Sequence, residues 1–166
     1  MLKLLGAAAV FCAVSWCGLD RAGWYRRRLD CLRTWQTAVL EGERMLCDLG
    51  ASTPDYLERL RELPLLRPMA EQCLIALKQE QRLGKAWTQA VSDAVFPLYQ
   101  EELEAVSGLG RVLGRYDAEE QRRALEDVRK RLEGFTARAE EERARLGRMW
   151  SVLGLTAGAL AVVLLY

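Results

Sequence analysis

Few side chains in this protein are of the kinds that carry out acid–base, nucleophilic or metal chemistry. The 166 residues include no histidine, which excludes the common zinc sites and the histidine-dependent hydrolytic triads. A P-loop and a dinucleotide-binding glycine motif are also missing from the sequence. The five cysteines are odd in number and form no CxxC pair, so we interpret them as small buried apolar residues in a reducing compartment. They are Cys12, Cys17, Cys31, Cys47 and Cys73.

Three consecutive carboxylates, Glu140, Glu141 and Glu142, are the most conspicuous potential metal ligands. Arg143 and Arg145 follow them directly and can pair with them along a helix. We therefore interpret these carboxylates as a solvated helix face rather than a metal site. The sequence predicts no catalytic, cofactor-binding or metal-binding residue, no small-molecule substrate and no enzymatic activity.

A short glycine-rich stretch carries charged side chains between two expected helices. Its backbone and its charged groups could form a docking edge for a protein partner, and a second interpretation stays open beside it. Glycine is commonly used for close packing and sharp turns, so these glycines could have a purely conformational role. The predicted docking residues are Gly108, Gly110, Arg111, Gly114, Arg115 and Asp117.

The elements that position these residues are predicted to be helices, with no useful strand alternation. Gly50 closes the first helix, and Thr53, Pro54 and Asp55 provide a cap, a first-turn proline and a carboxylate for the second. Asp117 can cap the last helix, with Glu120 reciprocating. The first helix can continue an apolar run before it, and the last extends to the final residue if no break intervenes. The expected helices lie at residues 25–49, 54–62, 69–83, 87–94, 98–113 and 118–148.

These helices are long enough to bury one modest core, which predicts an all-α single bundle of about six helices. Tryptophans in such a core are more often packing residues than recognition residues. The predicted core residues are Leu29, Leu32, Trp35, Val39, Leu46, Leu57, Leu60, Leu74, Leu77, Trp87, Val91, Phe96, Leu103, Val106, Leu113, Leu125, Val128 and Leu132.

Both ends of the sequence are apolar. Residues 4–19 and 149–166 carry no formally charged side chain, and crossing a bilayer takes about 20 mostly apolar helical residues. We therefore expect transmembrane helices at residues 1–19 and 149–166, flanking a domain at residues 20–148. Gly154 and Gly158 lie four residues apart, a spacing that favours helix packing inside the membrane. The alternative for the first run is a cleaved signal peptide, although no A-x-A-like exit follows it.

Arginines crowd the inner flanks of both apolar runs, for example Arg26, Arg27 and Arg28 after the first and Arg145 and Arg148 before the second. Basic residues accumulate on the cytoplasmic side of membrane segments, so the central domain is predicted to be cytoplasmic. Such arginines also contact lipid headgroups. Once Lys3 is set aside, 23 basic residues face 23 acidic ones. This balance argues against a nucleic-acid partner.

Several segments together resemble the stage III sporulation protein AB family over the whole sequence. The paired Leu-Gly repeat of residues 108–117 is the most specific of them, and residues 1–6, 25–28 and 150–155 also contribute. Residues 83–87 and 95–97 are distantly similar to the helical repeat of the F platform protein of type II secretion and type IV pilus systems.

The resemblance implies a role in endospore formation. It suggests a non-enzymatic platform or scaffold subunit of a secretion-like channel, in the mother-cell membrane or outer forespore membrane, that docks a cytosolic motor of the stage III sporulation AA ATPase type. Other channel subunits, the lipid bilayer and further copies of the same chain are the other expected partners. The alternatives are a membrane subunit that forms part of the pore by oligomerisation, or a generic membrane-anchored helical adaptor.

Overall fold

The computed structural model describes residues 2–113, 118–150, 152–153 and 156–157, and this part of the chain contains six α-helices and no β-strand. The all-α prediction is confirmed. Two π-helical turns, Glu43–Asp48 and Arg143–Gly147, follow α1 and α6, and a 3₁₀ turn, Leu109–Arg111, follows α5. The helices are α1 (Leu2–Gly42), α2 (Thr53–Arg61), α3 (Arg67–Lys78), α4 (Leu83–Asp93), α5 (Gln100–Gly108) and α6 (Ala118–Glu142).

Two compact units divide the chain. The inner unit is Asp30–Thr136, and the outer unit combines Met1–Leu29 with Ala137–Tyr166. The predicted domain at residues 20–148 therefore extends beyond the inner unit at both ends. No helix in the described part of the chain combines the length and the apolarity needed to cross a bilayer. The structure thus gives no support for the predicted membrane helices at residues 1–19 and 149–166, which stay predictions.

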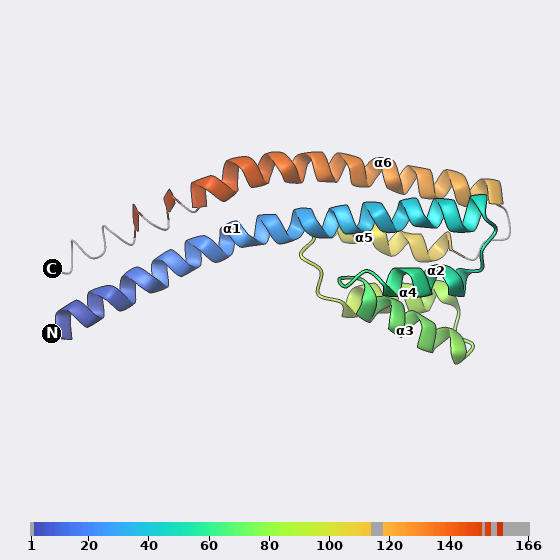
Figure 1. Ribbon diagram of the computed structural model, residues 1–166, viewed down its shortest axis with the longest axis horizontal. Helices are drawn as coiled ribbons and strands as arrows, with labels where there is room; N and C mark the ends of the chain where they lie inside the picture. The colour runs from blue at the N-terminus through green and yellow to red at the C-terminus, as the bar shows by residue number, and fades with distance from the viewer. Residues whose placement is uncertain (1, 114–117, 151, 154–155, 158–166) are drawn as a thin grey trace. The chain divides into compact units, whose positions relative to one another are not determined.

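Within Asp30–Thr136, the second half of α1 runs beside α6, while the short helices α2 to α5 cover another side of it (Figure 1). Consecutive short helices pack on one another, α2 on α3, α3 on α4 and α4 on α5. Tyr56 attaches α2 to α1, because its buried hydroxyl donates a hydrogen bond of 2.9 Å to the carbonyl oxygen of Ala38. Gly42 faces the same ring, where a Cβ would lie 3.2 Å from it.

The start of α2 follows local sequence rules, with one correction. Gly50 ends the first helical segment at φ 62°, as predicted. The N-cap is Ser52 and not Thr53: the Asp55 amide donates to the Ser52 hydroxyl, and the Ser52 amide donates to the Asp55 carboxylate. This reciprocal arrangement satisfies two amide groups that have no partner inside the helix.

Other predicted helix bounds also need correction. The third helix ends at Lys78 and not near residue 83, because Glu80 adopts φ 58° and turns the chain into α4. The fifth begins at Gln100 and ends at Gly108. The last helix does not run uninterrupted beyond Glu142, because the π-helical turn Arg143–Gly147 follows it.

The predicted core is confirmed except at Leu74, Leu77, Phe96 and Leu103, which are half-buried. Several large buried residues are absent from the predicted core, although Met69 and Leu109 belong to the apolar faces of two expected helices. The absent residues are Tyr25, Tyr56, Leu66, Met69 and Leu109.

Candidate interaction surfaces

Gly110 belongs to the close contact between α4 and the turn that follows α5. It is buried, and a Cβ at this position would lie 2.7 Å from the Cβ of Trp87 and 2.8 Å from its indole ring. Gly84 contributes from the other side, where a Cβ would lie 3.2 Å from the Gly110 carbonyl oxygen. Two elements approach this closely only because neither glycine has a side chain. The conformational interpretation therefore accounts for Gly110.

Trp87 lies at the centre of this contact. Its indole nitrogen donates a hydrogen bond of 2.9 Å to the carbonyl oxygen of Val106, and its side chain is completely buried. Trp35 packs edge-on against both Trp87 and Phe96, with ring centroids 6.0 Å and 5.6 Å apart. The two tryptophans are thus packing residues that hold α1, α4 and the loop after α4 together.

The remaining predicted docking residues are only partly described. Gly108 is half-buried at the end of α5, and the Arg111 side chain is exposed three residues later. Gly114, Arg115 and Asp117 lie outside the described residues, as do Gly154 and Gly158. The structure therefore brings Gly108, Gly110 and Arg111 together, and the docking role of the stretch stays a prediction.

The cysteines in the inner unit are poor nucleophiles. Burial raises the pKa of the Cys31 thiol to about 12, with a further contribution from the Glu102 carboxylate, and burial raises that of Cys73 to about 11. The pKa of the half-buried Cys47 thiol is also raised, mainly by burial. Because the thiolate is the reactive form, these side chains stay protonated and inert at neutral pH.

Buried Glu102 is a structural carboxylate. It lies on α5 and accepts a hydrogen bond of 2.8 Å from the Tyr99 amide, which precedes the helix. Such a bond satisfies an amide at the helix N-terminus, where negative charge is favourable. Elsewhere in the described residues, no three His, Cys, Asp or Glu side chains are grouped so that they could hold a metal ion.

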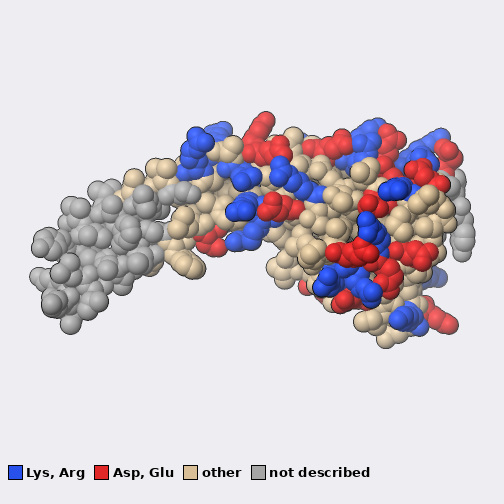
Figure 2. Space-filling model, viewed as in Figure 1, with Lys and Arg blue, Asp and Glu red and all other residues tan. Residues whose placement is uncertain are grey.

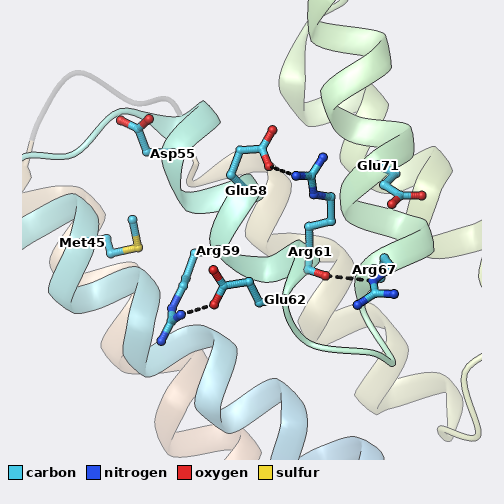
Figure 3. A pocket seen from close by; sticks show the side chains of 8 residues that line it. All are labelled: Met45, Asp55, Glu58, Arg59, Arg61, Glu62, Arg67 and Glu71. Atoms are coloured by element: carbon cyan, nitrogen blue, oxygen red, sulfur yellow. Dashed lines mark hydrogen bonds and ion pairs between the residues drawn. The ribbon is translucent and has the colours of Figure 1, made fainter.

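A charged hollow of about 580 Å³ lies between α2, α3 and the turn after α1 (Figure 3). Arg61 pairs with Glu58 at 2.8 Å, and Arg59 pairs with Glu62. The Arg67 side chain donates to the Arg61 carbonyl oxygen. The exposed carboxylates and guanidiniums that line the hollow largely neutralise one another. The hollow is therefore better suited to binding a polar protein surface than to catalysing a reaction. The sequence analysis missed it, although the alternating Glu and Arg residues of α2 were a visible signal. The lining residues are Met45, Asp55, Glu58, Arg59, Arg61, Glu62, Arg67 and Glu71.

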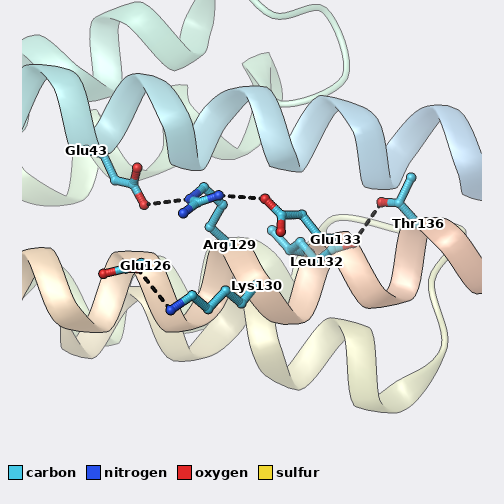
Figure 4. A network of polar contacts seen from close by, with 7 residues as sticks. All are labelled: Glu43, Glu126, Arg129, Lys130, Leu132, Glu133 and Thr136. Carbon is cyan, nitrogen blue, oxygen red and sulfur yellow. Dashed lines mark hydrogen bonds and ion pairs between the residues drawn. The ribbon is translucent and has the colours of Figure 1, made fainter.

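A network of ion pairs joins α6 to the π-helical turn after α1 (Figure 4). Arg129 bridges Glu43 and Glu133, at 3.3 Å and 2.6 Å. Arg122 reaches Asp48 at 2.7 Å, and the hydrogen bond that it donates to this carboxylate raises the pKa of the guanidinium. These pairs are partly exposed, so they fix the register of the two segments more than they stabilise the fold.

Basic and acidic side chains alternate over the visible face of Asp30–Thr136 (Figure 2). On that face neither sign of charge forms an extended patch of its own. A surface of this kind suits contact with another protein of mixed charge.

The outer unit contains a buried charge. Arg28 is only 2% exposed and donates a hydrogen bond of 2.7 Å to the Glu142 carboxylate, 114 positions away in the sequence. The Arg28 guanidinium also lies 6.0 Å from the Trp24 ring centre, on the same helix. Glu140 and Glu141 are exposed, as predicted for a solvated helix face, whereas Glu142 is half-buried against Arg28. Because Arg28 is buried, it does not belong with the arginines predicted to contact lipid.

Next to this pair, the outer unit exposes both apolar and basic side chains. Arg143, Arg145 and Arg148 are exposed and form no ion pair with any described residue. The predicted pairing of Arg143 and Arg145 with the preceding carboxylates is therefore wrong. The outer unit also exposes large apolar side chains in each of its two segments. They are Trp16 and Leu19 in the first segment, and Met149, Val152 and Leu153 in the second.

Comparisons with known proteins agree with the resemblance noted in the sequence. The family model described as Stage III sporulation protein AB (spore_III_AB) matches residues 3–166. The protein named Stage III sporulation protein AB from Bacillus subtilis (strain 168) is 28% identical over 174 aligned residues, which cover 99% of each chain. No solved structure matches this chain. The similarity to the F platform protein therefore stays a prediction. Because the family model covers nearly every residue, the chain belongs to the Stage III sporulation protein AB family.

Proposed function

We propose that this protein is a non-enzymatic, membrane-anchored scaffold subunit of a secretion-like channel complex in endospore formation. Its family membership supports the sporulation role. One observation carries the membrane part: the segments on both sides of the inner unit expose large apolar side chains, Trp16 and Leu19 before it and Met149 and Val152 after it. Exposed apolar groups of this size are typical of a membrane or protein contact.

The proposed location is the mother-cell membrane or the outer forespore membrane, with the central domain in the cytoplasm. The two apolar runs would be its membrane spans. Arginines on the inner flanks of both runs support this orientation, because basic residues stay on the cytoplasmic side. Protease added outside intact protoplasts should leave the central domain uncut. Digestion of that domain from outside would contradict the orientation.

The proposed cytosolic partner is a stage III sporulation AA-like ATPase, docked at the connection between α5 and α6. Arg111 supports this proposal, because its side chain is exposed at the end of the 3₁₀ turn that follows α5. Arg115 and Asp117 follow in the sequence and would extend the charged edge. Gly110 would act indirectly, by holding the turn against Trp87.

Co-purification from sporulating cells tests this docking. The double variant R111E/R115E reverses two charges at the proposed edge, and we expect it to recover severalfold less ATPase, because like charges across an interface are repulsive. The matched control is R44E/R82E, which reverses two exposed arginines that form no ion pair with a described residue. If both variants recover as much ATPase as the native chain, the proposed docking edge is contradicted. Failure of the native chain to recover any channel subunit would contradict the scaffold function itself.

A further inference from the structure

We propose that Arg145 and Arg148 form a binding site for the phosphate groups of anionic phospholipids. This inference rests on the proposed function, because it requires the outer unit to lie at a membrane. It goes further by naming the lipid class that the protein selects and the side chains that select it.

The first argument is that these two guanidiniums are available. Both side chains are exposed, and neither forms a hydrogen bond or ion pair with a described residue. Glu142, the nearest preceding carboxylate, is bound to buried Arg28 at 2.7 Å. The Arg28–Glu142 pair therefore occupies the carboxylate that lies three residues before Arg145 and six residues before Arg148.

The second argument is the position of apolar side chains on the same stretch of chain. Met149 is four residues after Arg145, and Val152 is four residues after Arg148, so each arginine precedes an apolar residue on its own helix face. Met149 is 43% exposed and Val152 is 56% exposed. A face that changes from guanidinium to apolar within about 6 Å, at about 1.5 Å per residue, matches the boundary between lipid headgroups and acyl chains.

The third argument is the chemistry of the side chain. A guanidinium offers several donors in a plane and binds phosphate oxygens in a bidentate manner. Lipids with a net negative charge keep this attraction, whereas a zwitterionic lipid offsets it with its own cation. Other charged groups of the same segment reinforce the site or oppose it. Arg143 adds a third exposed cation, and Glu140 and Glu141 lie one turn or more before Arg145.

The experiment uses the full-length chain reconstituted into phosphatidylcholine vesicles. Trace spin-labelled phosphatidylglycerol or phosphatidylcholine reports the relative association of each lipid with the protein. We expect the native chain to prefer the anionic lipid roughly threefold or more, and this preference to fall in high salt because the attraction is electrostatic. The double variant R145Q/R148Q should lose most of the preference. The control R44Q/R82Q removes the same charge from the inner unit and should keep it.

The outcomes separate this inference from the proposed function. Equal association of both lipids with the native chain, in vesicles that do incorporate it, would overturn the lipid site and leave membrane anchoring intact. An equal loss of preference in the two double variants would also overturn the site, because net charge alone would then explain the preference. Failure of the native chain to float with these vesicles, whichever labelled lipid they carry, would contradict membrane anchoring itself, and the lipid site with it.

Discussion

Gly110 illustrates at the scale of one residue how a missing side chain sets the distance between two elements. A Cβ at this position would lie 2.7 Å from Trp87, which is itself fixed by its hydrogen bond to Val106. We predict that Gly110→Ala lowers the free energy of unfolding by about 1–3 kcal/mol, as overpacking in a core does. Urea unfolding monitored by tryptophan fluorescence measures the change. Gly134→Ala is the matched control, because its Cβ would meet nothing within 4 Å on α6. It should be neutral or stabilising, and an equal loss in both variants would contradict the packing role.

The buried charge of Arg28 gives a second prediction at this scale. Glu142→Gln replaces the carboxylate that accepts the Arg28 hydrogen bond with a neutral amide, so the buried guanidinium loses the negative charge of this partner. The expected loss is about 1.5–3 kcal/mol, because hydrogen bonds to charged groups are the strong ones and Glu142 is partly exposed. Thermal unfolding in detergent measures it. Glu141→Gln, at the exposed neighbouring position, should change the midpoint little. An unchanged midpoint for Glu142→Gln would contradict the prediction that the negative charge of Glu142 stabilises the buried guanidinium.

At the scale of the element, α2 depends on its N-terminal cap. Ser52→Ala removes the hydroxyl that accepts from the Asp55 amide, so we expect a loss of about 1 kcal/mol. Ser92→Ala, at an exposed position near the end of α4, is the control and should be close to neutral. The two free energies of unfolding by urea are compared directly. Thr53→Ala distinguishes the alternatives: a larger effect there than at Ser52 would return the cap to the residue that the sequence favoured.

Sequence reasoning succeeded where an element is defined locally. Gly50 was a visible stop, because the positive φ that it adopts suits glycine. Ser52 and Thr53 were hard to separate, since both are hydroxyl residues beside Pro54, and the decisive partner is Asp55 three positions after Ser52. The end of α3 could not be predicted, because the chain turns at Glu80, a residue that rarely adopts φ 58°.

The candidate sites were harder to predict than the helices, because their contacts join distant positions. Arg28 and Glu142 are 114 positions apart, and no local sequence pattern predicts that they pair. The fit of Gly110 against Trp87 likewise depends on how two helices meet. Sequence alone could name these residues as notable, but it could not say which were already occupied by contacts inside the protein.

At the scale of the whole molecule, the buried thiols predict a pH dependence of stability. The pKa of Cys31 rises from 9.0 to about 12 in the folded state, and that of Cys73 from 9.0 to about 11. Above about pH 9, the unfolded chain loses these protons while the folded chain keeps them, so stability is present below that pH and is lost above it. Each thiol contributes up to about 1.4 kcal/mol per pH unit in that range.

Urea unfolding at about pH 8 and at about pH 10 measures this dependence. The native chain should lose stability between the two, and the double variant C31A/C73A should lose less. For each protein, the quantity compared is the change in the free energy of unfolding between the two pH values. Any packing cost of the substitutions is the same at both pH values and therefore cancels. If the free energy of unfolding falls equally with pH in both proteins, then other groups, and not these thiols, cause the loss of stability at alkaline pH.

The bond between Arg28 and Glu142 closes the chain on itself, since everything from one residue to the other forms a loop with both ends fixed at one point. The segments that lead away from the two residues therefore begin close together, whatever the length of an exposed turn between them. A short insertion at the exposed turn around Gly50 should leave this attachment unchanged, whereas a substitution at Arg28 or Glu142 should weaken it.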